Sequence, residues 1–123
     1  MDRAATISVA LAMLSGVSSA GAAGDATRGQ ELYESRCVAC HSVDQSRVGP
    51  AHQGVYGRRA GRVVGYDYSA ALKASKVVWS DKTLDAWLAN PEALIPGQKM
   101  GYRVTEAGDR ADLIAYLRKV SPP

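Results

Sequence analysis

The sequence predicts a small all-α domain in which about four to five short helices are joined by long loops. Apolar residues recur at helical spacing in several short segments, and a residue that commonly caps helices stands just before each of them. No segment alternates apolar and polar residues for long enough to form a strand. At 123 residues, the chain is short enough to be a single domain.

The first helix is expected in the segment GDATRGQELYESRC. Asp25 is a good N-cap, because its carboxylate can accept hydrogen bonds from the first free N–H groups of a helix. Leu32 and Tyr33 form the apolar side of this helix, with Gly29 one turn earlier. After a long gap, Ser69 is placed to cap a second, short helix in AALKASK.

Two further helices are expected in the second half of the chain. Ser80 can cap DKTLDAWLA, which ends at Asn90 and Pro91 and carries Leu84, Trp87 and Leu88 on one face. Thr105 can cap the last helix, roughly residues 106 to 119. The apolar stripe of that helix consists of Leu113, Ile114 and Leu117.

Long loops are expected between these helices, at residues 41–68 and 95–104. Both segments are rich in glycine or proline and show little periodicity. A loop as long as the first one needs a reason in a small domain, and wrapping around a cofactor is such a reason.

Residues 1–23 are typical of a secretory signal peptide, with a polar start, an apolar run and then small residues. The apolar run is too short for a stable membrane span. Cleavage is expected after Ala20, Ala22 or Ala23. Residues 24–123 would then be the mature domain, in the periplasm of a bacterium; an uncleaved anchor and a disordered tail are the alternatives.

The charge of the chain excludes one class of partner. The formal net charge is +3, which is too mild to indicate a nucleic-acid-binding protein. No run of five or more like charges is present either.

The stretch RCVACHSV contains the only two cysteines, Cys37 and Cys40, followed directly by His41. Such a pair can belong to a zinc site, a redox dithiol, a disulfide or a haem attachment site. Zinc would need distant His52 as a fourth ligand, and adjacent Cys40 and His41 would strain a tetrahedral site. A redox dithiol is expected in a βαβ context, which the sequence does not predict. A plain disulfide stays open.

The C-x-x-C-H spacing is typical of covalent haem attachment. Two thiols add to the two vinyl groups on one side of the porphyrin, and a helical turn then carries His41 under the iron as proximal ligand. Export agrees with this interpretation, because bacterial haem attachment takes place outside the cytoplasm. One haem c bound through Cys37 and Cys40 is therefore the favoured interpretation.

The sixth iron ligand separates electron transfer from ligand binding or peroxide chemistry. Met1 and Met13 lie in the predicted signal peptide, which leaves Met100 in the loop IPGQKMGY. A single methionine usually packs in a core. Met100 is flanked by Lys99 and Gly101 on a polar loop, where there is no core to fill, and this favours a ligand.

From about Gly29 to Val120, the chain resembles class I c-type cytochromes, particularly the group of mitochondrial cytochrome c and bacterial cytochrome c2. The matching motifs occur in order: CVACH, VGP, GRRAG, GYDYSAAL, a tryptophan, TLDAWLANPEALIPGQKM and RADLIAYL. The resemblance implies a cytochrome c fold wrapped around one covalently bound haem. It also implies a soluble, monomeric one-electron carrier. No general base, nucleophile or substrate pocket is evident, so an enzyme is not expected.

The resemblance implies a role for each residue at a matching position. His41 and Met100 would be the axial ligands, and the Pro50 carbonyl would accept a hydrogen bond from His41. Haem propionate would be bound by Tyr68 and Trp79 as donors and by Arg58 as a counter-charge. The close crossing of the first and last helices is expected at Gly29 and Tyr33, against Leu113 and Tyr116.

Several residues depart from the mitochondrial pattern. Those near Met100 are Leu72 for asparagine, Trp87 for tyrosine, Gln98 for threonine and Tyr102 for phenylalanine. Leu72 removes a polar contact, so the haem crevice should be drier. His52 replaces an apolar residue, and a tuning or surface role is favoured over axial ligation. Without haem, an apolar slot should separate His41 from Met100, lined by Leu72, Trp79, Leu88 and Tyr102.

The resemblance implies redox partners and transient docking to membrane complexes. The implied partners are a cytochrome bc1-type reductase and an oxidase, photosynthetic reaction centre or terminal reductase, or one dedicated dehydrogenase. Basic residues expected near the haem edge are Arg36, Lys73, Lys76, Lys82 and Lys99. Glu92 and Ala93 replace paired lysines, so weak electrostatic steering is expected. A haem enzyme or small-ligand sensor, with Met100 detached, is the alternative function.

Overall fold

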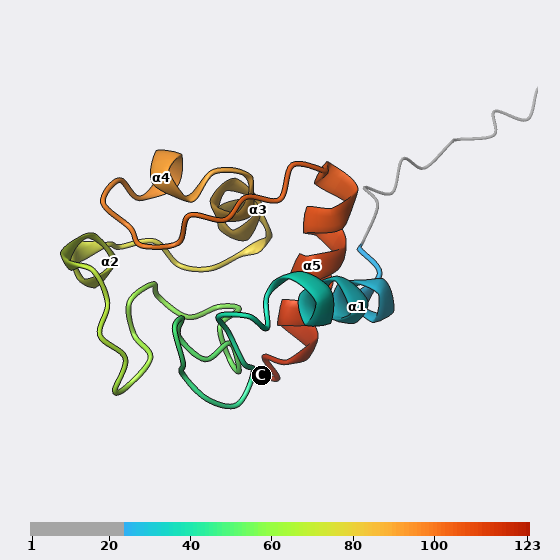
Figure 1. Cartoon of the computed structure of the whole chain (residues 1–123), viewed down its shortest axis with the longest axis horizontal. Coiled ribbons are helices and arrows are strands. Elements are labelled where there is room, and N and C mark those ends of the chain that lie inside the picture. Colours follow the sequence, from blue (N-terminus) through green and yellow to red (C-terminus); the bar gives the residue numbers. More distant parts are fainter. Residues whose placement is uncertain (1–23) are drawn as a thin grey trace, which may run out of the picture.

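The computed structural model describes residues 24–123, and the predicted signal peptide lies outside them. The described chain contains five helices (Figure 1): α1 (Ala26–Arg36), α2 (Ala70–Ala74), α3 (Asp81–Ala89), α4 (Pro91–Leu94) and α5 (Ala107–Lys119). It contains no β-strand, only one isolated bridge between Arg59 and Val78. The all-α prediction is therefore confirmed. None of the helices found in residues 24–123 has the length and apolar character needed to cross a membrane.

Side-chain caps fix where four of the helices begin, and three of these caps were predicted. Asp25 accepts hydrogen bonds from the N–H groups of Thr27 and Arg28 at 2.9 and 3.1 Å, which caps α1 as predicted. Ser69 caps α2 in the same way, at 3.2 Å from the Leu72 nitrogen. Ser80 begins α3 in a reciprocal capping box with its third residue, a threonine. These polar residues replace hydrogen-bond partners that the first turn of a helix lacks.

The prediction that Thr105 caps the last helix is wrong. The residue immediately before α5 is Glu106, and its side chain makes no capping hydrogen bond. The Thr105 carbonyl instead accepts a hydrogen bond from the Arg110 guanidinium at 3.0 Å, and Arg110 is in turn held by Asp85 at 2.7 Å. A side chain caps a helix from the position just before the first helical residue, so Thr105 lies one residue too early.

Helix α4 was not predicted, because Asn90 and Pro91 were interpreted only as the end of α3. The same two residues also begin α4. Pro91 is its first residue, where the missing N–H costs nothing, and the Asn90 side chain accepts a hydrogen bond from the Ala93 nitrogen at 3.3 Å. One dipeptide therefore ends one helix and starts the next.

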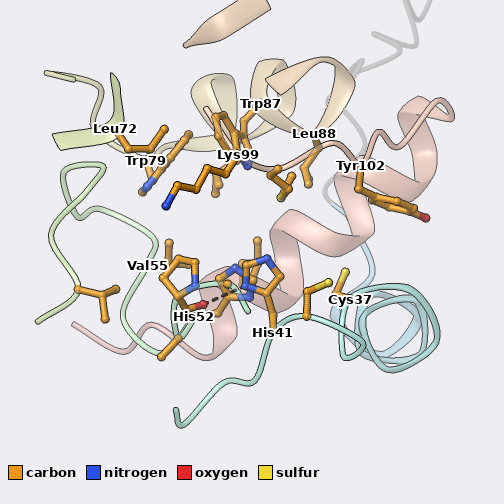
Figure 2. A pocket seen from close by; sticks show the side chains of 18 of the residues that line it. Cys37, His41, His52, Val55, Leu72, Trp79, Trp87, Leu88, Lys99 and Tyr102 are labelled. Atoms are coloured by element: carbon orange, nitrogen blue, oxygen red, sulfur yellow. Dashed lines mark hydrogen bonds between the residues drawn. The ribbon is translucent and has the colours of Figure 1, made fainter. Parts of the chain in front are cut away.

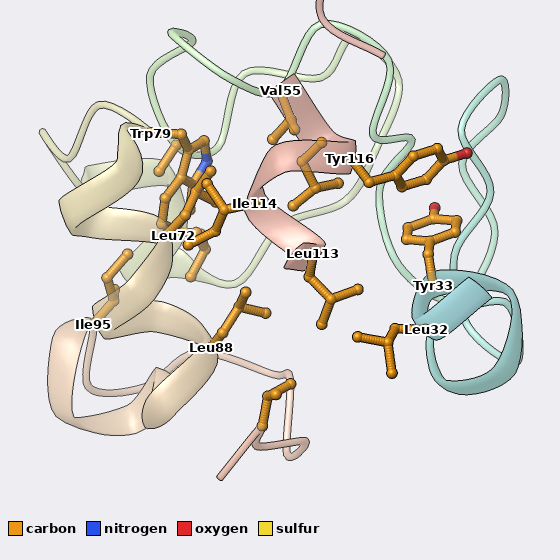
Figure 3. Close-up of a cluster of buried hydrophobic side chains, with 14 residues drawn as sticks. Leu32, Tyr33, Val55, Leu72, Trp79, Leu88, Ile95, Leu113, Ile114 and Tyr116 are labelled. Carbon is orange, nitrogen blue, oxygen red and sulfur yellow. The ribbon is translucent and has the colours of Figure 1, made fainter. Parts of the chain in front are cut away.

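Helices α1 and α5 cross closely at Gly29, as expected. A Cβ atom on Gly29 would lie 1.9 Å from the carbonyl oxygen of Asp112, so the two backbones meet where a side chain is missing. Beside this point the rings of Tyr33 and Tyr116 pack 5.2 Å apart between centroids. Figure 3 shows Leu32 and Tyr33 of α1 facing Leu113 and Tyr116 of α5, and Leu113 is only 1% exposed.

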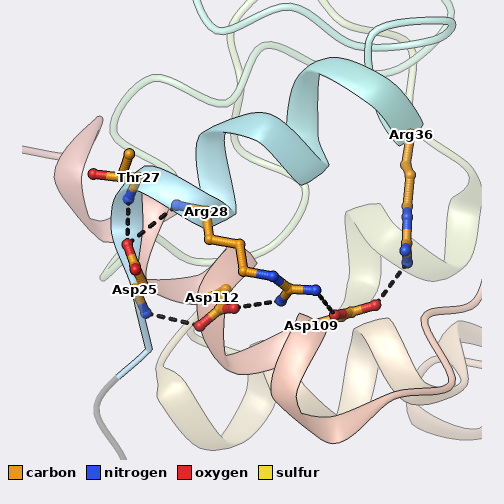
Figure 4. A network of polar contacts seen from close by, with 6 residues as sticks. All are labelled: Asp25, Thr27, Arg28, Arg36, Asp109 and Asp112. Carbon is orange, nitrogen blue, oxygen red and sulfur yellow. Dashed lines mark hydrogen bonds and ion pairs between the residues drawn. The ribbon is translucent and has the colours of Figure 1, made fainter.

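Ion pairs join α1 to α5 beside the same crossing (Figure 4). The Asp109 carboxylate lies 2.7 Å from the Arg28 guanidinium and 3.0 Å from that of Arg36. Asp112 binds Arg28 as well and accepts a hydrogen bond from the backbone nitrogen of Asp25 at 2.7 Å. Two acidic residues of α5 thereby hold both ends of α1.

Candidate functional site

A cavity of about 490 Å³ lies inside the helices and the long loops. Figure 2 shows Cys37, His41 and His52 on one side of this cavity, and Leu72, Trp79, Trp87, Leu88 and Tyr102 on the other. Met100 lines the cavity as well. The expected apolar slot is therefore present, and all four residues predicted to line it do so. The cavity explains why loops as long as residues 41–68 occur in so small a domain.

His41 is held in a defined orientation in the cavity wall. Its backbone nitrogen donates to the Cys37 carbonyl at 2.9 Å, which closes the turn that begins at the first cysteine. Its Nδ1 lies 2.9 Å from the Pro50 carbonyl oxygen. Because a carbonyl can only accept, Nδ1 carries the proton, and the lone pair is on Nε2. Burial lowers the pKa of His41, so the ring is neutral and suited to binding a metal.

The loop that follows His41 is shaped to hold this ring. A Cβ atom on Gly49 would lie 2.1 Å from Cε1 of His41, so only glycine fits against the imidazole. The backbone nitrogen of Gly49 donates to the Cys40 carbonyl at 2.9 Å. The Arg47 guanidinium donates to the Val38 carbonyl at 2.7 Å and so braces the turn between the cysteines. Sequence reasoning assigned no role to Gly49 or Arg47, although the VGP motif marks the place.

His52 packs directly against His41. Their ring centroids are 4.1 Å apart and their planes differ by 21°, which is a stacked arrangement. Nδ1 of His52 lies 2.9 Å from the Tyr33 hydroxyl oxygen. Burial, reinforced by nearby His41 and Arg58, lowers the pKa of His52 to about 3, so this ring is neutral as well. His52 shares the side of the cavity with His41 (Figure 2), so it does not face His41 as an opposing ligand would.

The two thiols stand at the same wall as His41. No disulfide joins the two cysteines; Cys37 is half-buried in the cavity wall and Cys40 is exposed. Burial raises the pKa of Cys37 to about 11. The described residues bring no group of three or more His, Cys, Asp or Glu side chains together as a metal site.

The opposite wall is mostly apolar. Trp79 and Trp87 meet edge to face, with ring centroids 5.2 Å apart. Of the four departures near Met100, Leu72, Trp87 and Tyr102 line the cavity, but Gln98 does not. The Gln98 amide nitrogen donates to Glu92 at 3.0 Å instead. Lys99 and Tyr102, the neighbours of Met100 in the chain, lie across the cavity from His41 (Figure 2).

The predicted propionate donors are all found in the cavity wall. Tyr68, Trp79 and Arg58 line it, and the neighbouring Arg59 does so too. The Tyr68 oxygen accepts a hydrogen bond from the Val63 nitrogen at 3.0 Å, which leaves its O–H free to donate. The Arg58 Nη1 donates to the Gln53 carbonyl at 3.1 Å. A carboxylate placed here would meet three kinds of donor: a hydroxyl, an indole N–H and a guanidinium.

These features define a small haem-attachment protein: paired thiols and a neutral histidine beside an apolar cavity. The sequence profile of the family described as cytochrome c matches residues 26–121. Cytochrome c 2.1 of Caenorhabditis briggsae is 47% identical over 98 residues, which cover 77% of this chain and 88% of that protein. Cytochrome c of Euglena viridis is likewise 47% identical over 98 residues, covering 77% of this chain and 96% of that protein.

The fold comparison agrees with the sequence comparisons. Cytochrome cH from Methylobacterium extorquens superposes with a TM-score of 0.74 at 39% identity and covers 78% of this chain and 99% of that one. The chain belongs to the cytochrome c family. It is an electron-transfer protein rather than an enzyme, and it carries one haem c attached through Cys37 and Cys40.

Proposed function

We propose that the protein is a soluble, monomeric one-electron carrier of a bacterial periplasm whose haem iron is bound by His41 and Met100. The observation that carries this proposal is that His41 and the segment containing Met100 line opposite walls of the cavity. His41 presents a neutral ring whose Nδ1 is already bound to Pro50, which leaves Nε2 for a metal. Met100 lines the same cavity, and Lys99 and Tyr102, which are close to it in the chain, lie opposite His41. Bound haem supplies the ferric/ferrous couple.

The remaining side chains fix and shield the site. The Pro50 carbonyl and the close approach of Gly49 restrain the His41 ring. Tyr68, Trp79 and Arg58 would donate to a haem propionate and so offset the cost of burying its charge. Leu72 and Leu88, each no more than 8% exposed, exclude water from the face opposite His41.

The ligation is tested by the optical spectrum of protein matured with haem in a periplasm. We expect the weak near-infrared band of methionine-to-ferric-iron charge transfer, and no carbon monoxide binding to the reduced protein at neutral pH. Met100→Ala should abolish the band and admit carbon monoxide. Tyr102→Phe alters the same loop without touching a ligand, so it should keep the band. A parent protein without the band, or one that binds carbon monoxide readily, would favour a haem enzyme or sensor.

The partner is proposed to be one that relies little on electrostatic attraction. Several basic residues assigned to the docking face are already engaged within the protein. Arg36 lies 3.0 Å from Asp109, and Lys73 lies 3.2 Å from Asp67. The Lys99 ammonium donates to the Asp67 carbonyl at 3.3 Å. These contacts reduce the positive field that would steer an acidic partner.

The candidate partners are a cytochrome bc1-type reductase as donor and an oxidase, reaction centre, terminal reductase or dedicated dehydrogenase as the other partner. Electron-transfer rates with each candidate, measured against ionic strength, test the steering proposal. We expect a shallow dependence on salt. A steep fall of the rate with added salt would contradict it.

Export is tested by the mass of the mature protein. Gly24 already packs against α5, since a Cβ atom on it would lie 1.9 Å from the Ala111 carbonyl oxygen, so cleavage before it would leave the domain intact. We expect haem-loaded protein that has lost residues 1–20, 1–22 or 1–23. A full-length chain in the periplasmic fraction would show that the N-terminal segment is retained.

A further inference from the structure

A hydrogen-bonded pair of polar side chains, Tyr33 and His52, lies directly behind the face of His41. His52 stacks on the His41 ring with 4.1 Å between centroids, and its Nδ1 is 2.9 Å from the Tyr33 hydroxyl oxygen. Tyr33 also contacts the His52 ring edge-on, at 5.5 Å between centroids. An apolar residue would fill the same space, so the polar pair calls for a reason beyond packing.

Both members of the pair are held firmly by the surrounding fold. The backbone nitrogen of His52 donates to the Ser42 carbonyl at 3.1 Å, and that of Gln53 donates to Val43 at 2.8 Å. The segment carrying His52 is thus paired with the residues that follow His41. Tyr33 is only 3% exposed and is packed by Tyr116 across the helix crossing. A chain of contacts therefore runs from the α1–α5 crossing to the His41 ring.

We infer that His52 is a positioning residue for His41: anchored by the Tyr33 hydroxyl, it fixes the plane of the His41 ring and tunes the potential of the haem iron through it. The inference rests on the proposed role of His41 as an iron ligand. The Pro50 carbonyl fixes one atom of the His41 ring, and rotation about that contact is limited by what packs on the ring face. Stacking with His52 supplies that second restraint.

The chemistry of the pair also predicts the direction of the tuning. A neutral imidazole and a hydroxyl are polar groups, and a more polar surrounding favours the more highly charged ferric state. Replacing His52 by an apolar ring should therefore favour the ferrous state and raise the midpoint potential. Removing the Tyr33 hydroxyl should act in the same direction, because the His52 ring then loses its anchor.

The test compares His52→Phe, Tyr33→Phe and the double variant, all loaded with haem. Phenylalanine keeps a flat ring at either position; at Tyr33 it removes only the hydroxyl, and at His52 it removes the polar atoms in exchange for a slightly larger ring. Tyr116→Phe is the matched control, since it removes a tyrosine hydroxyl from the same cluster and Tyr116 makes no side-chain hydrogen bond within residues 24–123. Midpoint potentials are measured together with the proton NMR spectrum of the ferric protein, in which the shifts of haem methyl and axial histidine protons report the ring plane.

We expect His52→Phe to shift the ferric/ferrous equilibrium about threefold toward the ferrous state, a rise of about 30 mV at 59 mV per tenfold change. The pattern of haem methyl shifts should change with it. Tyr33→Phe should have a smaller effect of the same sign, and none once His52 is already replaced. Tyr116→Phe should leave both readouts unchanged.

Two results would overturn the inference and separate it from the proposed function. If Tyr33→Phe acts equally with and without His52, or resembles Tyr116→Phe, the pair serves packing alone while the ligation stands. If the parent protein shows no strongly shifted histidine ring signals, His41 does not bind the iron. In that case both the proposed ligation and the positioning role of His52 fail.

Discussion

The crossing of α1 and α5 makes a sharp prediction for Gly29→Ala. The added methyl group would lie 1.9 Å from the Asp112 carbonyl oxygen and 2.6 Å from its carbonyl carbon, whereas ordinary contact begins at 3.4 Å. The helices would have to separate by about 1.5 Å, because a backbone carbonyl inside a helix has no rotamer by which to move aside. That separation loosens the packing of Tyr33 against Tyr116.

Two opposing effects set the size of the stability change expected for Gly29→Ala. Overpacking of a well-packed contact costs about 1–3 kcal/mol, and a rigid backbone obstacle places this site at the upper end. Alanine is favoured over glycine inside a helix by about 1 kcal/mol. The net expectation is a loss of about 2 kcal/mol in the free energy of unfolding, or a fall in Tm of about 8–16 °C for a domain of this size.

Gly108→Ala is the matched control. Gly108 lies in the first turn of α5, and a Cβ atom there would meet nothing within 4 Å. The same substitution should therefore stabilise the protein by up to about 1 kcal/mol. Urea unfolding of haem-loaded protein, followed by circular dichroism, measures both variants. If Gly29→Ala is as stable as the parent protein, the close backbone crossing is not a feature of the folded protein in solution.

Two further predictions concern a helix start and an ion pair. Ser80→Ala should lower the free energy of unfolding by about 1 kcal/mol, because it removes the α3 cap. Thr105→Ala should leave that free energy nearly unchanged, because Thr105 caps no helix. Equal losses for the two variants in urea unfolding would contradict this prediction. The hydrogen bond from Arg28, aided by Arg36, lowers the pKa of Asp109, so the stabilisation is present at neutral pH and is lost as the pH falls through this lowered pKa. Asp109→Asn should thus lower the free energy of unfolding clearly at pH near 7 and progressively less below about pH 4. If the difference in unfolding free energy between the parent protein and Asp109→Asn does not narrow as the pH falls, the ion-pair account is refuted.

Much of the helical framework was predictable because its signals are local. Asp25, Ser69 and Ser80 are capping residues placed directly before segments with helical spacing, and each caps the helix that was expected. One failure, the Thr105 cap, was an error of one residue, and the other came from residues with two local meanings. Asn90 and Pro91 both end α3 and begin α4, since proline is disfavoured after a helical residue but suited to the first position of a new helix.

The haem-attachment motif was also predictable, because the spacing of Cys37, Cys40 and His41 has a chemical reason. The hydrogen bond from His41 to the Pro50 carbonyl was expected from the resemblance and is present, but the stacking of His52 on His41 was not expected. Tyr33 and His52 are 19 residues apart and belong to a helix and a loop, so their hydrogen bond exists only in the folded chain. The sequence showed that His52 is a polar residue at a usually apolar position. Only the structure shows that the Tyr33 hydroxyl is its hydrogen-bond partner.

The sequence was least able to predict which basic side chains are paired with acidic ones in the folded protein. Arg36 was assigned to a docking surface from the family resemblance, yet its guanidinium lies 3.0 Å from the Asp109 carboxylate and helps to hold α1 against α5. Lys73 likewise faces Asp67. A charge that is paired within the protein projects a weaker field than its formal value. Each such pair contributes zero to the formal net charge of +3, so the field near these residues is weaker than their basic side chains alone would suggest. The proposal of weak steering rests on these contacts, and it predicts that shape and apolar contact at the docking face matter more to partner choice than charge does.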